Sequence, residues 1–239
     1  MVKLYQNFDI KKNDKGSIIL IGNFDGVHLG HQKLFKQAQF YKKKYNLKIG
    51  VVNFNPMPKM FFNQSLKNFR LSSISQKINL LNNQSVDFII TKKFDKTFSK
   101  TKSINFIKKI LSNKLKARFI FVSSNFRFGN KREGDVGFLI QNEKKYNYQV
   151  VKPKPLLINR KIVSSSLIRN CLEKGFLEKA NKLLNRKWSI EGVVQKGRQV
   201  GKKIGFPTCN IDIKDYVLAK PGVYAVKVLK KNNLKFLKE

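Results

Sequence analysis

The chain has 239 residues, of which 41% are hydrophobic and 12% aromatic, so its composition excludes a disordered chain. Its 50 lysine and arginine residues against 14 acidic residues give a formal net charge of +36, which favours anionic ligands. Two cysteines and no apolar run near the roughly 18 residues of a membrane span predict a cytoplasmic chain without a disulfide framework or a membrane partner.

Strand and helix patterns alternate along the chain as far as residue 186. Short runs rich in Ile, Val and Phe predict strands at Ser17–Ile21, Ile49–Phe54, Asp87–Ile90 and Phe119–Val122. Helical spacing predicts helices at Gln32–Tyr45, Gln76–Asn82, Lys102–Leu115, Ser165–Lys174 and Leu177–Leu184. This alternation indicates an α/β fold, with a parallel sheet covered by helices on both faces. Ligands of such sheets bind at the carboxyl ends of the strands.

The pattern changes after residue 186. Strands are predicted at Ile190–Val194 and Val223–Leu229, joined by glycine-containing connections and with no long helical stretch. We therefore expect two domains, an α/β domain at residues 1–186 and an all-β domain at residues 187–239. The second is short for a closed barrel, so we expect only part of one.

A glycine-rich loop with two histidines follows the first of these strands. It reads Ile-Gly-Asn-Phe-Asp-Gly-Val-His-Leu-Gly-His from Ile21 to His31. Its glycines permit close approach of the backbone to a ligand, and the helix that follows presents unpaired N–H groups and a positive dipole end to an anion. His28 and His31 are the only histidines of the chain, which disfavours the alternative that both lie by chance on a surface turn. We predict that both face a bound phosphate.

A second segment, Ser164-Ser165-Ser166-Leu167-Ile168-Arg169, opens a predicted helix with an arginine. Ser165 or Ser166 can cap this helix, and its amides together with Arg169 can bind phosphates. An ordinary capped helix would explain this segment by itself. Together with the His-Leu-Gly-His sequence, it resembles the nucleotidyltransferase superfamily that transfers an adenylyl or cytidylyl group.

Three further motifs narrow the resemblance. They are Asn-Phe-Asn-Pro-Met-Pro at 53–58, Asn-Phe-Arg-Phe-Gly at 125–129 and Gly-Phe-Pro-Thr-Cys-Asn at 205–210. With the glycine loop they resemble the prokaryotic bifunctional riboflavin kinase/FAD synthetase family. The resemblance implies a Rossmann-like N-terminal FAD synthetase (FMN adenylyltransferase) domain that joins FMN and ATP into FAD and releases pyrophosphate. It also implies a C-terminal β-barrel that phosphorylates riboflavin to FMN with ATP, both reactions being assisted by Mg²⁺.

The resemblance also implies roles for individual residues. The catalytic set would be His28, His31, Asn125 and Arg169. The nucleotide would contact Gly22, Asn23, Phe24, Asp25, Gly26, Gly30, Ser165, Ser166 and Arg169. The flavin would contact Phe54, Pro56, Phe62, Asn125, Phe126, Arg127 and Phe128, although any one of these phenylalanines could equally belong to the core. The riboflavin kinase site would use Gly201, Gly205, Pro207, Thr208 and Asn210, with Thr208 and Asn210 holding the metal ion.

Four residues depart from the usual family pattern. Met57 stands in place of a histidine, Ser123 of a glycine, Cys209 of an alanine and Lys202 of an arginine. The barrel of the family also continues beyond the part matched here and carries a catalytic glutamate there. We therefore expect this chain alone to lack riboflavin kinase activity.

Two alternatives remain open. One is a nucleotidyltransferase that acts on another phosphorylated small molecule. The other is a basic nucleic-acid-binding module, which is disfavoured because only 8 of the 50 basic residues are arginine and the lysines are spread along the chain. We predict that the partners are small-molecule substrates (ATP, FMN and riboflavin) and not a specific nucleic acid. We make no prediction of the oligomeric state.

Overall fold

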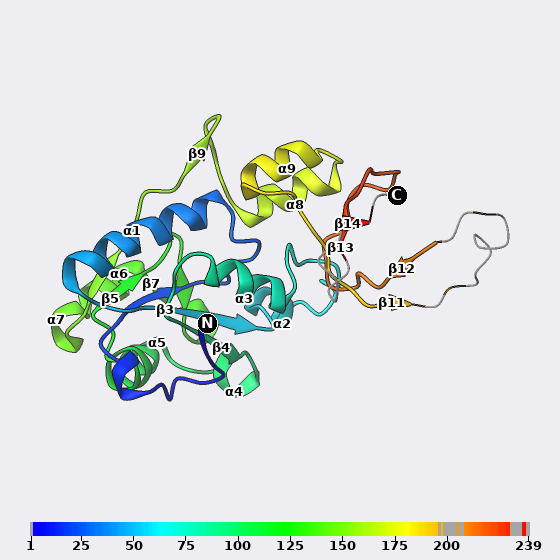
Figure 1. The fold of residues 1–239 in the computed structure, drawn as a ribbon. Helices are drawn as coiled ribbons and strands as arrows, with labels where there is room; N and C mark the ends of the chain where they lie inside the picture. The colour runs from blue at the N-terminus through cyan, green and yellow to red at the C-terminus, as the bar shows by residue number, and fades with distance from the viewer. Residues whose placement is uncertain (1, 196, 198–204, 206–207, 230–235, 238–239) are drawn as a thin grey trace.

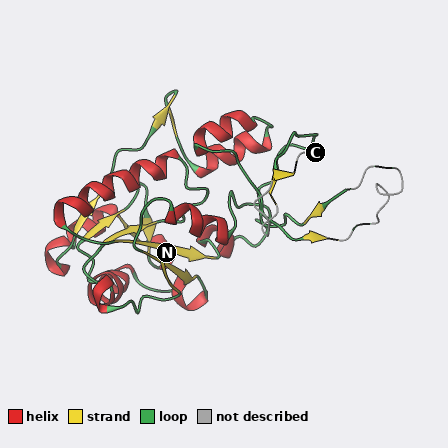
Figure 2. Ribbon diagram, viewed as in Figure 1, coloured by secondary structure: helices red, strands yellow, loops and turns green. Residues whose placement is uncertain are grey.

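The computed structural model describes residues 2–195, 197, 205, 208–229 and 236–237. Its centre is a six-stranded parallel sheet in the order β1-β4-β3-β2-β5-β8. The strands are β1 (Lys3–Tyr5), β2 (Ile18–Ile21), β3 (Ile49–Asn55), β4 (Phe88–Lys93), β5 (Phe119–Phe121) and β8 (Gln149–Val151). Figures 1 and 2 show the sheet lying between helices. The predicted α/β fold, with a Rossmann-like parallel sheet, is confirmed.

Alternate side chains of the sheet enter two separate cores. Ile18 and Leu20 of β2 pack with helices α1 (Leu29–Tyr45) and α3 (Ile74–Asn82). Ile19 and Ile21 pack on the opposite face with the π-helix η2 (Phe106–Lys114) and helix α6 (Val136–Gln141). Because successive side chains of a strand point to opposite faces, a strand buried on both sides reads as a continuous apolar run. This is why the central strands are visible in the sequence.

The remaining elements are short or lie at the edges of the sheet. The helices are α2 (Pro58–Phe62), α4 (Lys96–Ser99), α5 (Ser103–Asn105), α7 (Glu143–Tyr146), η1 (Lys12–Asp14) and η3 (Asn130–Arg132). Two short ladders pair β6 (Arg127–Phe128) with β7 (Gly134–Asp135), and β9 (Leu157–Ile158) with β10 (Lys161–Ile162). Within the described ranges, no helix combines the length and the apolarity needed to cross a bilayer.

A third core joins the last two helices to the segment around residue 71. Helices α8 (Ser165–Glu173) and α9 (Leu177–Leu184) pack with Leu71, Val163 and Trp188. In Figure 1 this yellow helix pair lies beyond the N-terminal end of α1. The pair therefore stands at the edge of the sheet where β2 and β3 end.

The C-terminal part differs from the prediction in the extent of its strands. The structure pairs β11 (Val194–Gln195) with β12 (Asn210–Ile211), and β13 (Val228–Leu229) with β14 (Phe236–Leu237), both antiparallel. The longer strands predicted at 190–194 and 223–229 are therefore wrong in extent. Val193, Val223 and Val226 predicted these strands by their apolar character, but their side chains are exposed and are not packed in a core of the described residues. A two-stranded ladder that covers no hydrophobic face is only marginally stable.

Candidate active site

The loop between β2 and α1 makes a sharp turn at the carboxyl edge of the sheet. Phe24, Gly26 and Val27 have positive φ angles of 47°, 76° and 37°, a conformation that costs little for glycine and is strained for a β-branched valine. A Cβ on Gly26 would lie 3.0 Å from the side chain of Leu71. Such strain persists only where the surroundings enforce it, and it is found often at functional sites.

His28 and His31 lie against each other at the start of α1. Their rings are stacked with centroids 3.7 Å apart, and His28 is the residue that precedes the helix. A Cβ on Gly30 would lie 3.1 Å from the His28 ring, so the glycine leaves room for this stack. Burial, followed by the charges of Arg169 and Arg186, lowers the pKa of His28 to about 4. Burial, followed by His28, lowers the pKa of His31 well below its ordinary value. Both rings are therefore neutral near pH 7.

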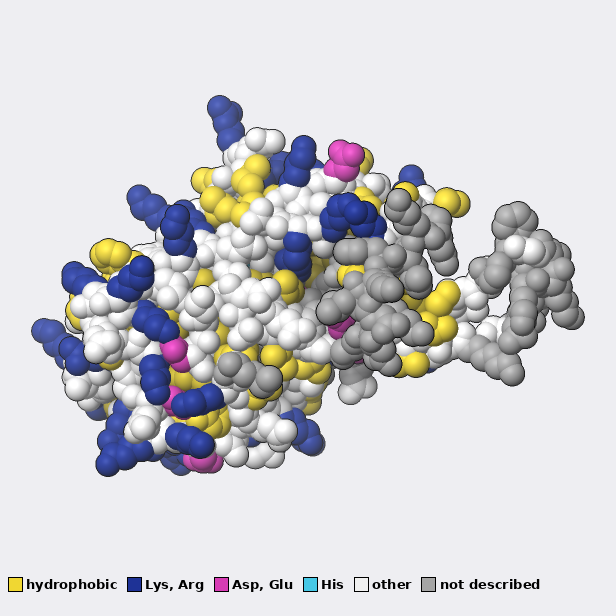
Figure 3. Space-filling model, viewed as in Figure 1, with side chains coloured by type: hydrophobic (Ala, Val, Ile, Leu, Met, Phe, Trp, Pro, Cys, Tyr) yellow, Lys and Arg dark blue, Asp and Glu magenta, His cyan; other side chains and the backbone are white. Residues whose placement is uncertain are grey.

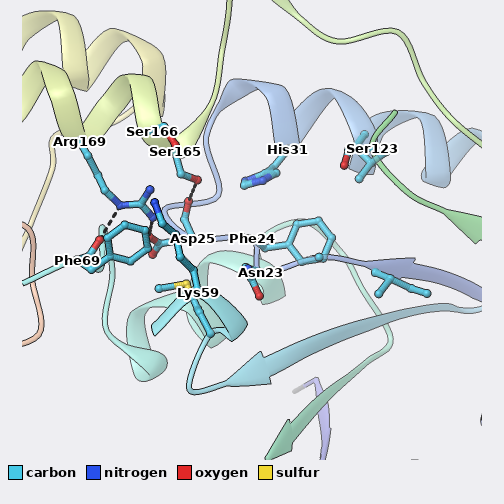
Figure 4. A pocket seen from close by; sticks show the side chains of 14 residues that line it. Asn23, Phe24, Asp25, His31, Lys59, Phe69, Ser123, Ser165, Ser166 and Arg169 are labelled. Atoms are coloured by element: carbon cyan, nitrogen blue, oxygen red, sulfur yellow. Dashed lines mark hydrogen bonds and ion pairs between the residues drawn. The ribbon is translucent and has the colours of Figure 1, made fainter. Parts of the chain in front are cut away.

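A pocket of about 280 Å³ opens beside His31. Its lining comes from the loop after β2, the first turns of α1, the segment after β3, the end of β5 and the start of α8, as Figure 4 shows. The predicted residues that line it are Gly22, Asn23, Phe24, Asp25, His31, Ser165, Ser166 and Arg169. The pocket thus joins the glycine loop to the Ser-Ser-Ser-Leu-Ile-Arg segment, whose Ser165 is 140 residues after Asp25 along the chain. His28, Gly26 and Gly30 do not line it, and they shape the loop from behind.

Asp25 and Arg169 form a buried ion pair in the wall of this pocket. Arg169 Nη2 lies 2.6 Å from Asp25 Oδ2, and Asp25 also accepts hydrogen bonds from the backbone N–H groups of Leu71 and Ser72. Arg169 Nε donates to the Phe69 carbonyl at 2.6 Å, and its guanidinium lies 3.7 Å from the centre of the Phe69 ring. Several contacts therefore fix the arginine before any ligand binds.

The cap of helix α8 differs from the prediction. Ser164, and not Ser165 or Ser166, precedes the helix, and its side chain accepts a hydrogen bond from Leu167 N. The Ser165 hydroxyl instead donates to the Asp25 carbonyl at 2.9 Å. Ser164 caps the helix, so the side chains of Ser165 and Ser166 can face the pocket.

Sequence reasoning gave no site role to Leu34, Lys59 and Phe69, which also line this pocket, and the last two can contact a ligand phosphate or ring. Lys59 lines it with its ammonium 5.1 Å from the centre of the Phe69 ring, and the Arg169 guanidinium lies 3.7 Å from the centre of the same ring. Neither residue belongs to a recognisable motif. The only signal was the Pro-x-Pro segment just before Lys59, whose buried Met57 also lines the pocket.

The residues predicted to bind the flavin are divided between a second pocket and the core. Asn125, Phe126 and Arg127 line a neighbouring pocket of about 430 Å³. Ser123 lines the first pocket and donates to Asn125 Oδ1 at 2.8 Å, so the two pockets adjoin at this loop. Phe54 and Phe128 are 9% and 8% exposed and belong to the core of the sheet, whereas Phe62 is 67% exposed. Phe126 stacks on Phe128 with ring centroids 5.5 Å apart. Pro56 follows the end of β3.

The predicted kinase residues lie in the C-terminal part. Gly205, Thr208 and Asn210 are exposed, and Gly205 has a φ of 84°. Gly201 and Pro207 lie outside the described residues. Over those parts of the chain that are described, no three His, Cys, Asp or Glu residues gather as a metal cluster.

Comparison with known proteins decides the family. Residues 10–167 match the profile of FAD synthetase, and residues 184–237 match that of riboflavin kinase. The curated bifunctional riboflavin kinase/FMN adenylyltransferase of Buchnera aphidicola subsp. Schizaphis graminum is 40% identical over 230 residues, which are 96% of this chain and 74% of that protein. The chain belongs to the bifunctional riboflavin kinase/FMN adenylyltransferase family.

Two other members of this family support the assignment. The proteins of Haemophilus influenzae and Escherichia coli K12 are 36% and 34% identical, each over 90% of this chain and over 70% and 69% of their own lengths. A solved structure entitled macrolide-efflux protein, from Streptococcus pneumoniae, matches with a TM-score of 0.83 at 24% identity. The match covers 97% of this chain and 76% of the solved chain, and it supports the fold alone. The FAD synthetase match contains the glycine loop, His31 and Ser165, and it ends two residues before Arg169.

Proposed function

We propose that this chain transfers the adenylyl group of ATP to FMN, giving FAD and pyrophosphate. One observation carries the proposal: His31, Ser165, Ser166 and Arg169 line a single pocket at the carboxyl edge of the sheet. That edge is where parallel α/β sheets bind their ligands. Membership of a family whose curated relatives are named for this reaction supports the same conclusion.

The reaction needs no nucleophile from the protein. A phosphate oxygen of FMN attacks the α-phosphorus of ATP and forms the new P–O bond. The bond from the α-phosphorus to the bridging oxygen breaks, and pyrophosphate leaves with its electron pair. Catalysis then depends on aligning the two phosphates and on stabilising the charge that develops on the leaving group.

In this proposal the cations of the pocket bind the polyphosphate. Arg169 and Lys59 line the pocket, and the first amides of α8, at Ser165 and Ser166, add the positive end of a helix dipole. His31 is neutral, so it acts by donating or accepting a hydrogen bond and not by its charge. His28 supports His31 from behind through the ring stack.

We assign the flavin to the side of the pocket where Ser123 meets Asn125. Asn125, Phe126 and Arg127 are accessible from the second pocket, and Phe126 offers a stacking surface for a planar ring. Phe128 supports this surface from the core, to which Phe54 also belongs. Pro56 directly follows β3, and the exposed Phe62 packs against Phe61 and Phe94.

Magnesium fits the two sites differently. Asp25 is the carboxylate in the wall of the first pocket, and its oxygens already accept bonds from Arg169, Leu71 and Ser72. These residues do not form a cage for a metal ion, so we derive no step through one. In the second domain, Thr208 and Asn210 offer two neutral oxygen donors of the kind that Mg²⁺ accepts when substrate phosphates complete its shell. They would hold the ion there.

The other predictions remain part of this proposal. They are the division into domains at residues 186 and 187 and a cytoplasmic location. Basic side chains are scattered over several elements on the face shown in Figure 3 and do not gather in one patch. This supports small anionic substrates over a specific nucleic-acid interface.

One incubation tests the proposal. The purified chain is mixed with ATP, Mg²⁺ and either FMN or riboflavin, and the flavins are separated by chromatography. FAD formed from FMN supports the proposed reaction, and its absence overturns it. FMN formed from riboflavin would overturn the predicted absence of kinase activity. A second phosphorylated acceptor converted in place of FMN would favour the other nucleotidyltransferase reaction.

A further inference from the structure

Residues of the two matched regions meet along one backbone ladder. We call residues 213–217 the docking segment and residues 68–72 the central loop. Phe69 N and Arg70 N both donate to the Asp215 carbonyl, at 3.2 and 2.8 Å, and Val217 N donates to the Arg70 carbonyl at 2.8 Å. Arg70 and Tyr216 form an isolated parallel bridge. The docking segment therefore extends the central loop like a short added strand.

Side chains reinforce this ladder at both ends. Asn68 Nδ2 donates to the carbonyls of residues 213, 214 and 216 at 3.4, 2.8 and 3.1 Å. Tyr216 is 4% exposed, and its hydroxyl donates to Gln76 Oε1 at 2.8 Å and accepts from Glu191 N at 3.0 Å. Trp188 Nε1 donates to the Leu71 carbonyl at 3.0 Å. The bonds of Asn68 and Trp188 hold the central loop directly, whereas those of the Tyr216 hydroxyl fix the docking segment against α3 and residue 191.

The other side of the central loop holds the ion pair of the pocket. The Phe69 carbonyl accepts from Arg169 Nε, while Leu71 N and Ser72 N donate to Asp25. The Phe69 ring also lies against the Arg169 guanidinium. One five-residue loop is thus fixed by the docking segment on one side, and it orients Asp25 and Arg169 on the other.

We infer that the docking segment positions Arg169 for the polyphosphate through the central loop, with Tyr216 and Asn68 as positioning residues. The inference rests on the proposed function, because it deepens the role of the same pocket. Neither side chain lines the pocket, so each would act only by fixing the loop. An arginine held in advance loses less conformational freedom when its ligand binds. Loosening the loop should therefore weaken ATP binding more than it slows the chemical step.

Two pairs of variants test the inference. Tyr216→Phe removes only the hydroxyl, and Tyr224→Phe is its control, because among the described residues the Tyr224 hydroxyl bonds only the Lys220 carbonyl. Asn68→Ala removes the three bonds to the docking segment. Asn63→Ala is its control, because the Asn63 side chain bonds only Ser65 within the part of the chain that the structure describes. We expect Tyr216→Phe and Asn68→Ala each to raise the KM for ATP by about threefold to tenfold, with kcat changed by less than about twofold. The KM for FMN and both control variants should be unchanged.

A further cycle separates positioning from general stability. In an Arg169→Lys background the guanidinium that the central loop orients is absent. Tyr216→Phe should therefore add no further increase in the KM for ATP in that background. Equal effects of Tyr216→Phe in both backgrounds would overturn the inference. So would a lowered melting temperature with an unchanged KM for ATP, since this would indicate a merely structural contact.

Two separate measurements distinguish a failure of this inference from a failure of the proposed function. FAD formation by the unmodified chain is measured first, and its absence would count against the proposed function. Calorimetric titration with ATP alone then tests positioning by itself. A dissociation constant for ATP that is raised in Tyr216→Phe and unchanged in Tyr224→Phe supports the inference, and equal constants in all three proteins overturn it.

Discussion

The rings of His28 and His31 are stacked with their centroids 3.7 Å apart, and neither Nδ1 atom has a hydrogen-bond partner among the described residues. Two protonated imidazoles at this distance would repel each other in a buried site. Burial lowers the pKa of both rings; Arg169 and Arg186 add to the lowering for His28, and His28 adds to it for His31. The pair therefore provides polar hydrogen-bonding atoms beside the pocket without adding charge, and the positive charge comes from Arg169 and Lys59.

Replacing His31 by alanine should reduce FAD formation by about tenfold or more, because His31 is the member of the pair that lines the pocket. The rate is measured by flavin chromatography under saturating ATP and FMN. Lys33→Ala, an exposed change on the same helix, is the control and should leave the rate unchanged. An unaltered rate in His31→Ala, with a far-ultraviolet circular dichroism spectrum like that of the parent, would place the phosphate site elsewhere.

The buried His28 should make the fold sensitive to acid. Its pKa is about 4 in the folded chain, against an ordinary value of 6.5, so the unfolded chain binds more protons between these values. The free energy of unfolding should therefore be at its full value above pH 6.5 and fall as the pH is lowered towards 4, by roughly 3 kcal/mol at most. Urea unfolding at several pH values measures this slope. In His28→Gln the slope should be shallower, and a slope equal to that of the parent would contradict the assignment.

Much of the sheet could be predicted from the sequence, because its central strands are buried on both faces. The sequence does not predict β1 and β8, because Lys-Leu-Tyr and Gln-Val-Val are short edge strands that include polar, exposed residues. The equally short β5 is predicted because its three residues, Phe-Ile-Phe, are all apolar and buried. The first helix begins at Leu29 and not at residue 32, because Gly30 and the histidines weaken the helical pattern at its start. Each error concerns a short or irregular stretch.

The pocket could be predicted in part. The glycine loop and the serine–arginine segment have local patterns, and the structure brings them together. The contacts of Asp25 with Leu71 and Ser72, and of Arg169 with Phe69, join segments far apart in the sequence and carry no local signal. Phe54 and Phe128 also illustrate the limit, because an aromatic residue at the end of a strand looks the same whether it packs in the core or faces a ligand.

The Asp25–Arg169 ion pair should contribute more to stability than an exposed pair of the same charge type. Asp25→Asn leaves a buried guanidinium without its counter-charge, and we expect the free energy of unfolding to fall by about 3–5 kcal/mol. Asp9→Asn breaks the exposed pair with Lys114 and should cost less than about 1 kcal/mol. Urea unfolding at pH 7 compares the two variants. Equal losses would show that the Asp25 pair is not isolated from solvent.

Lys77 should destabilise the fold in its charged form. Its side chain is buried on α3 and makes no hydrogen bond or ion pair with any residue that the structure describes. Burial lowers its pKa to about 8, with Asp25 opposing this shift and Arg70 adding to it. Because the unfolded chain binds more protons between this value and the ordinary 10.5, stability should rise with pH across that interval.

Below pH 8 the charged form costs about 3 kcal/mol, so Lys77→Met should raise the urea midpoint at pH 7 and remove the rise above pH 8. Lys36→Met, an exposed change on α1, is the control and should alter neither. A lower midpoint for Lys77→Met than for the parent at pH 7 would show that the charge of Lys77 has a stabilising partner.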